Sequence, residues 1–119
     1  MTTFDFGNTY GRRGPVPAHQ HSNGGGWVAD TATVSESVFV GREAMVYDNA
    51  RVSGNAVVTG NAKVFGDAEV FDDAKVFGDA EVSGNAKVTG NAKVTDNAVV
   101  YDNARVYGNA EVFDDAVVY

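Results

Sequence analysis

The stretch VFGDAEVFDDAKVFGDAEV, residues 64–82, decides the fold, because a valine returns in it at every sixth position. The same interval holds without a slip from Val28 to Val118. From Val34 onward an alanine stands two residues before each valine, with Val38 as the one substitute. A fixed short repeat of this kind predicts a solenoid, in which each unit buries its apolar face only against neighbouring units.

The period of six indicates strands. Residues six apart turn by about 240° net around an α-helix, so the valines would scatter over its surface instead of lining one face. In an extended chain, each valine and the alanine four residues later point to one side, while the residues flanking the valine point to the other. Gly, Asp and Asn follow at the positions where the chain must bend. Each hexad therefore predicts a short strand and a corner.

Corners at this interval wind the chain into a coil. Three sides give 18 residues per coil and four sides give 24, and the period alone leaves both open. Alanine beside each corner suits the tighter triangle. An interval of 18 also brings opposite charges together more often than like charges. The opposite pairs are Arg51/Glu69, Glu69/Lys87, Lys63/Glu81 and Lys93/Glu111, and the like pairs are Lys75/Lys93 and Lys87/Arg105.

The repeat from Val28 to Val118 resembles the hexapeptide-repeat family of left-handed parallel β-helices. Val and Ala match that motif in Val52-Ser53-Gly54-Asn55-Ala56, although Gly comes one place later than usual. The entry Gly25-Gly26-Trp27-Val28 and the unit Tyr47-Asp48-Asn49-Ala50-Arg51-Val52 are similar to bacterial and phage proteins often labelled acyltransferases by analogy of fold. The resemblance implies a left hand. We expect an all-β, single-stranded parallel β-helix, triangular, with about 18 residues per coil.

The sequence divides into two regions. Residues 1–26 are rich in Gly and polar residues and hold both prolines, so we expect a flexible or capping N-terminal arm. Residues 27–119 carry the repeat. Aromatic side chains offer anchors that could pin the arm to the β-helix, since burying one contributes about 1.5 to 3 kcal/mol. They are Phe4, Phe6, Tyr10 and Trp27.

Composition narrows the classes of partner. The net charge is -7 and the pI about 4.5, which opposes binding to nucleic acid phosphates. No apolar run approaches the roughly 20 residues that cross a bilayer, and no segment reads as a secretion signal. We therefore expect no nucleic acid partner, no membrane insertion, and a cytoplasmic or virion-associated protein. Cysteine is absent, which excludes disulfides and thiolate ligands.

Few residues could carry chemistry. Acyltransferases of the resembled family use a histidine at a cleft between subunits, and their carbonic anhydrase relatives use three histidines for zinc. This chain has only His19 and His21, both in the arm. The two histidines alternate across Gln20 and are weak candidates for a metal site, because solvated polar roles are commoner in such a segment. The Asp and Asn residues of the repeat are expected as corner residues. We expect no cofactor and no catalytic residue.

The outward residue after each valine indicates a binding surface. Aromatic residues at these positions fall on all three predicted faces, and a small monomer seldom exposes so much apolar area without a partner. The final coil also ends at Tyr119 with no residues after it to cover it. We expect a non-enzymatic structural or interaction protein that forms a homo-oligomer or an end-to-end polymer. The alternatives are an acyltransferase-like enzyme with a site between subunits and an acidic phage-encoded binder of a host protein. The expected interface residues are Trp27, Phe65, Phe71, Phe77, Tyr101, Tyr107, Phe113 and Tyr119.

Overall fold

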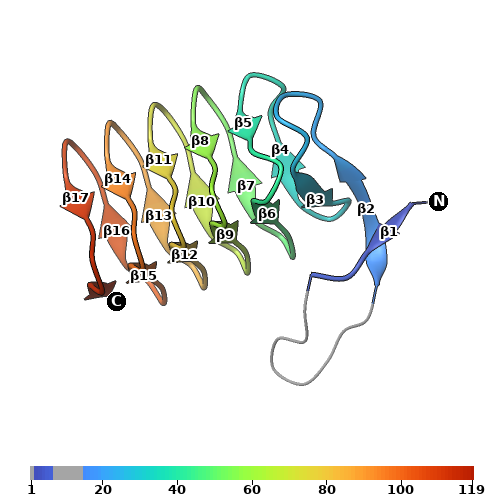
Figure 1. The fold of residues 1–119 in the computed structure, drawn as a ribbon. Coiled ribbons are helices and arrows are strands. Elements are labelled where there is room, and N and C mark those ends of the chain that lie inside the picture. Colours follow the sequence, from blue (N-terminus) through green and yellow to red (C-terminus); the bar gives the residue numbers. More distant parts are fainter. Residues whose placement is uncertain (1, 7–14) are drawn as a thin grey trace.

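A computed structural model describes residues 2–6 and 15–119, and these residues form strands and turns without a helix (Figure 1). The predicted anchor Tyr10 lies outside the described residues. The strands are Thr3–Phe4 (β1), Val16–Gln20 (β2), Trp27–Ala29 (β3), Thr33–Val34 (β4), Phe39–Val40 (β5), Met45–Val46 (β6), Arg51–Val52 (β7), Val57–Val58 (β8), Lys63–Val64 (β9), Glu69–Val70 (β10), Lys75–Val76 (β11), Glu81–Val82 (β12), Lys87–Val88 (β13), Lys93–Val94 (β14), Val99–Val100 (β15), Arg105–Val106 (β16), Glu111–Val112 (β17) and Val117–Val118 (β18).

Three parallel sheets form the sides of the coil. The first sheet contains β3, β6, β9, β12, β15 and β18, the second β4, β7, β10, β13 and β16, and the third β5, β8, β11, β14 and β17. Paired residues are 18 apart, as in Val70 with Val88 and Val76 with Val94. The triangular coil is therefore confirmed over the four-sided one, and the interval from Val28 to Val118 makes about five turns. The hand of the coil stays an implication of the resemblance.

The core is a column of valine and alanine. Val46, Val64 and Val82 have no exposed surface, and neither do Ala62 and Ala80 between them. The backbone joins the coils, because N–H groups donate to the carbonyl 17 residues later, as from Phe65 to Val82 at 2.9 Å. Each coil is thus bonded to the next on every side, which is the solenoid that the period predicts.

The corners use the residue two places after each valine. Glycine there has positive φ, as does aspartate: φ is 65° at Gly84 and 60° at Asp96. Glycine adopts this conformation without a Cβ penalty, and Asp tolerates it better than most residues. The described corners of the first coil, at Asp30, Glu36 and Arg42, are not among the positive-φ residues. Turns nevertheless lie at these positions, so the predicted corner positions are confirmed in every coil, and the first coil differs in its backbone conformation.

Charged side chains face outward in the predicted register. Glu69 pairs with Arg51 on one side and Lys87 on the other, and Lys93 pairs with Glu111. The Arg51 Nη1 to Glu69 Oε2 distance is 3.9 Å. The like pairs Lys75/Lys93 and Lys87/Arg105 are also neighbours.

The N-terminal segment extends the first sheet with antiparallel strands. β2 pairs with β3, placing His19 opposite Val28, and β1 pairs with β2. The turn after β2 reaches the third sheet, where Gly26 N–H donates to the Val40 carbonyl at 2.9 Å and Val40 N–H donates to the Asn23 carbonyl at 3.0 Å. Glycine is needed there, because a Cβ on Gly26 would lie 2.3 Å from the Gly41 carbonyl oxygen. The arm residues thus occupy strand edges at this end of the β-helix (Figure 1).

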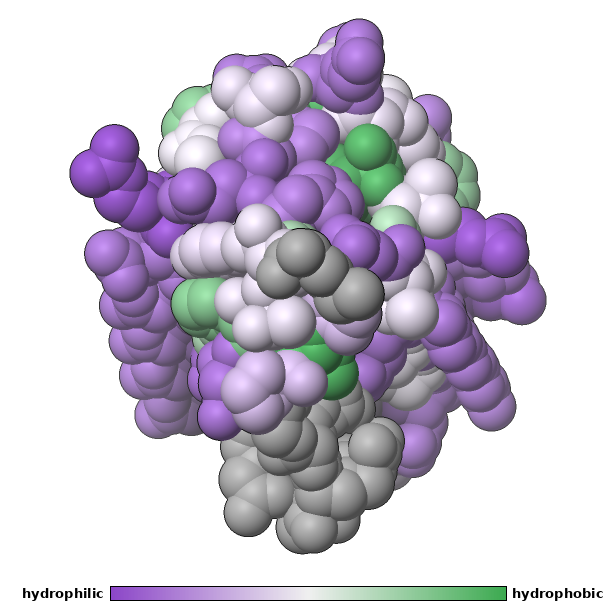
Figure 2. Space-filling model, turned by 90° about the vertical axis from the view of Figure 1, so that its right-hand side faces the viewer, coloured by the Kyte–Doolittle hydropathy of each residue, from purple (hydrophilic) through white to green (hydrophobic). Residues whose placement is uncertain are grey.

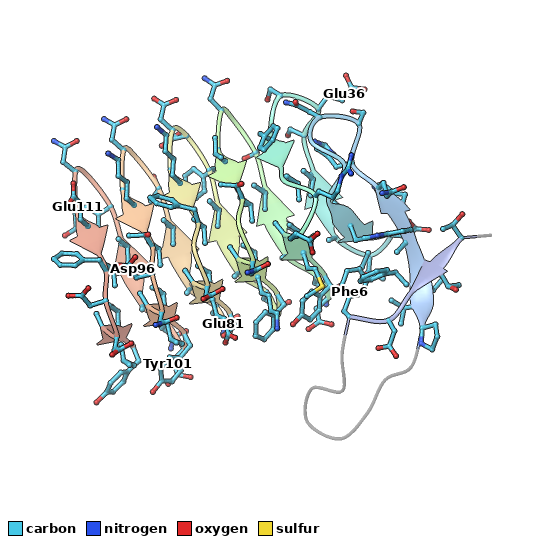
Figure 3. All side chains as sticks on the ribbon, viewed as in Figure 1. Phe6, Glu36, Glu81, Asp96, Tyr101 and Glu111 are labelled. Atoms are coloured by element: carbon cyan, nitrogen blue, oxygen red, sulfur yellow. The ribbon has the colours of Figure 1, made fainter. Side chains whose placement is uncertain are left out.

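Aromatic rings fix the arm to the first sheet. Phe4 stacks on Trp27 with ring centroids 4.6 Å apart, and Phe6 stacks on Tyr47 at 4.9 Å. Tyr47 in turn stacks on Phe65 at 4.9 Å. Phe6 points from the arm toward the coils in Figure 3. Three of the four predicted anchors therefore lie in one cluster.

Seen from the arm end, the described surface is mostly hydrophilic, with rows of polar side chains running back along the coils and small apolar patches between them (Figure 2). No helix long and apolar enough to cross a membrane is present in the residues described.

Candidate interaction site

The two histidines have separate environments. His19 is exposed, and its Nδ1 lies 2.7 Å from Asp30 Oδ1. His21 is buried, and its Nε2–H donates to the Val38 carbonyl at 2.8 Å. Strand β2 ends at Gln20, one residue before His21, so the two rings are not held on one continuous strand. His21 instead satisfies a carbonyl next to the core.

Described residues 2–6 and 15–119 contain no group of three His, Cys, Asp or Glu side chains that could hold a metal ion. His19 and His21 therefore stay weak candidates, each already bonded within the chain. His21 is a structural residue that sequence reasoning missed. Its partner is a backbone carbonyl, which no residue type in the sequence marks.

The predicted interface residues are spread over three sheets. Phe65, Tyr101 and Tyr119 follow strands of the first sheet, with Trp27 inside β3. Phe71 and Tyr107 follow strands of the second sheet, and Phe77 and Phe113 follow strands of the third. The structure therefore brings them together in columns along the β-helix. It does not gather them into one patch.

Exposure increases along the first column. Tyr47 is 3% exposed beneath Phe6, while Tyr119 is 77% exposed. Among the residues that the structure describes, Tyr119 stacks only on Tyr101, at 5.4 Å. On the other faces of the last coil, Tyr107 is 68% and Phe113 51% exposed. Val117 in the same coil is 53% exposed. The exposed apolar surface is therefore concentrated in residues 102–119.

One cavity lies between aromatic residues of the third sheet. Its volume is about 320 Å³, and Phe77 and Phe113 line it from coils that are two steps apart. Thr95, from the coil between them, also lines this Phe77–Phe113 slot. The remaining lining residues carry charge and are Lys93, Asp96 and Glu111.

An acidic groove adjoins the slot at the corner that follows the third sheet. Asp96 lines both, and the groove also contains Asp79, Asp114 and Asp115. Asp114 N–H donates to Asp96 Oδ2 at 3.1 Å, which orients that carboxylate. In Figure 3, Asp96 and Glu111 lie near the C-terminal end of the β-helix.

Sequence reasoning missed this site because it treated Asp at each bend only as a corner residue. The signal that could have found it is the alternation of an aromatic, a hydroxyl and an aromatic residue at intervals of 18, as in Phe77, Thr95 and Phe113.

Sheet pairing and repeat together define the chain as a β-solenoid of the parallel β-helix class. A family model described as the YdcK beta solenoid repeat matches it over residues 44–60, 50–64, 98–112 and 104–119. The chain is similar to that repeat in two blocks, one on each side of the middle coils. No curated protein and no solved structure gives a significant match.

Proposed function

We propose that this protein is a non-enzymatic structural or interaction protein whose β-helix self-associates through the last coil, residues 102–119. The observation that carries the proposal is the exposure of apolar side chains in that coil. Tyr107, Phe113, Val117 and Tyr119 are all exposed, whereas Tyr47 in the column of Tyr119 is buried. Pairing with a second copy would cover this surface.

The backbone of the last coil supports the same proposal. The series of N–H groups that donate to the following coil ends with Tyr101, which donates to Val118 at 3.0 Å. Among the described residues, the N–H groups of Arg105, Glu111 and Val117 donate to no following coil, unlike the equivalent groups of earlier coils. Unpaired strand edges of this kind favour pairing with another chain.

The opposite end favours a closed dimer over a polymer. A head-to-tail polymer would pair the last coil with β3, β4 and β5. β2 already occupies the edge of β3, and the turn at residues 23–26 is hydrogen-bonded to Val40 of β5. Two last coils related by a two-fold axis need displace nothing. Their strands would run antiparallel, because the two-fold axis reverses the direction of winding.

No specific observation favours either alternative function, the acyltransferase-like enzyme or the binder of a host protein. An acyltransferase-like site between subunits would need a histidine directed at a cleft, and the ring nitrogens described for His19 and His21 go to Asp30 and the Val38 carbonyl. A binder of a host protein is compatible with the acidic surface but needs no exposed last coil. No cofactor is part of the proposal.

Sedimentation of the purified chain over about 1–200 μM tests the proposal. A two-fold dimer of the 12.5 kDa chain should appear at about 25 kDa at the upper concentrations. Val117→Lys should shift the protein to the monomer, because it places a charge in the contact. Val99→Lys is the matched control, since Val99 holds the same position one coil earlier, and it should leave the dimer intact. A monomer at every concentration, or equal effects of the two variants, would contradict the proposal.

A further inference from the structure

The spacing of the coils leaves room for one planar group between the levels of Phe77 and Phe113. Successive coils are bonded directly, with Phe77 N–H donating to Val94 at 2.9 Å and Thr95 N–H donating to Val112 at 2.9 Å. Two steps of about 4.8 Å therefore separate the levels of Phe77 and Phe113. A planar group that covers Thr95, at the level of the coil between them, would lie about one step of 4.8 Å from the ring of Phe77 and one step from the ring of Phe113. The molecule itself stacks rings at this spacing, since Tyr47 and Phe65 are 4.9 Å apart.

The charges at the slot favour a cation. Asp96 and Glu111 line it together with Lys93, and Lys75 pairs with Lys93 one coil earlier. The adjoining groove adds the carboxylates of Asp79, Asp114 and Asp115, and the whole chain carries a net charge of -7. Because Asp96 Oδ2 accepts from the backbone, its carboxylate is already oriented and Oδ1 can accept from a ligand.

We propose that the slot binds the guanidinium group of an arginine in a basic segment of a partner protein. A guanidinium is planar and cationic, stacks on aromatic faces, and donates to carboxylates in a fork geometry. Neighbouring basic residues of the same segment would lie along the acidic groove. Phe113 lines the slot and also belongs to the last coil proposed for self-association, so the peptide is titrated into the Val117→Lys variant as well as into the parent chain.

The second sheet supplies an internal comparison. Phe71, Thr89 and Tyr107 repeat the aromatic, hydroxyl, aromatic order at the same interval. There the neighbouring outward residues are Glu69, Lys87 and Arg105, and on the third sheet they are Lys75, Lys93 and Glu111. Each sheet therefore has two cations and one anion at these positions. Thr89 Oγ1 also donates to Asp72 Oδ2 at 3.0 Å. The corners make the difference: those after the third sheet carry Asp79, Asp96, Asp114 and Asp115, whereas those after the second sheet carry Asp72 and Asp73, so the acidic groove favours the third sheet.

The test is a titration of the full chain with the peptide Ac-Gly-Arg-Arg-Gly-NH2, followed by amide chemical shifts in ¹H–¹⁵N NMR spectra at low ionic strength. Ac-Gly-Lys-Lys-Gly-NH2 carries the same charge and is the matched probe. We expect saturable shifts at Thr95, Asp96 and Phe113, with the arginine peptide bound about fivefold more tightly or better. No saturable shift up to about 10 mM peptide, or equal binding of both peptides, would overturn the proposal.

Two matched variants separate the slot from general electrostatics. Thr95→Phe fills the slot with a ring at a position where the repeat accepts aromatics, and it should weaken the arginine peptide about tenfold or more. Thr89→Phe makes the same change on the second sheet and should leave binding unchanged. Asp96→Asn should weaken binding while keeping the circular dichroism spectrum of the parent. Equal effects of Thr95→Phe and Thr89→Phe would show that the slot is not the site.

Discussion

The two ends of the β-helix place equivalent side chains in different surroundings. At the arm end, Tyr47 lies between Phe6 and Phe65 and is 3% exposed. At the other end of the same column, Tyr119 stacks on Tyr101 and is 77% exposed. The repeat is the same, so the difference comes from what lies on top of it. In a solenoid each coil contacts only its neighbouring coils. The contribution of a residue to the free energy of unfolding therefore depends on how many neighbouring coils cover it.

The largest difference is expected for charge in the core. Val46→Asp places a carboxylate at a position with no exposed surface and should unfold the protein or cost more than about 4 kcal/mol. Val118→Asp is the same change in the same column, but Val118 is only half-buried, so we expect a cost of about 1 kcal/mol. Urea unfolding followed by circular dichroism in dilute protein measures both. Equal losses would show that position along the stack does not matter.

A smaller difference is expected for the stacked rings. Phe6→Ala removes a ring that is 3% exposed and should lower the free energy of unfolding by about 2–4 kcal/mol. Tyr119→Ala also removes a ring stacked on one tyrosine, but it should cost less than about 1 kcal/mol, because that ring stays largely in water. The comparison uses the same urea titration. A loss for Tyr119→Ala as large as that for Phe6→Ala would contradict the interpretation of the arm as a cap.

The smallest difference is expected at two corner glycines with the same backbone conformation. Gly84 has φ 65° and Gly108 has φ 64°, so Ala at either carries a positive-φ penalty of about 1 kcal/mol. A Cβ on Gly84 would also lie 2.7 Å from Asp102 N, whereas one on Gly108 would meet nothing within 4 Å. Gly84→Ala should therefore lower the thermal midpoint more than Gly108→Ala. Equal midpoints would show that the coils separate to admit the Cβ.

The repeat could be predicted from the sequence because its signals agree at every level. Valines at every sixth position give the inward face, Gly and Asp two places later give the corners, and the pairing of Arg51 with Glu69 favours the 18-residue coil. Each of these depends on local geometry or on a neighbour at a fixed interval. Signals of this kind can be recognised in a single sequence without knowledge of the rest of the fold.

The arm could not be predicted in the same way, because no period sets its strands. β2 forms where Val16 to Gln20 meets the edge of β3, and the buried position of His21 depends on the Val38 carbonyl of another segment. The Phe77–Phe113 slot could not be predicted from the sequence for a different reason. Phe77, Thr95 and Phe113 are each ordinary residues for the outward face, and only their common cavity gives them a role.

The 18-residue interval between paired strands has a consequence for how the length of this protein can change. Duplicating or deleting 18 residues within the repeat returns every later residue to its original sheet, so stacked columns and corner positions survive. An insertion or deletion of six keeps each valine inward but rotates all later units by one face, which would move Phe113 away from the sheet of Phe77. Duplications or deletions of whole 18-residue coils are thus the changes in length that keep each outward side chain on its original sheet.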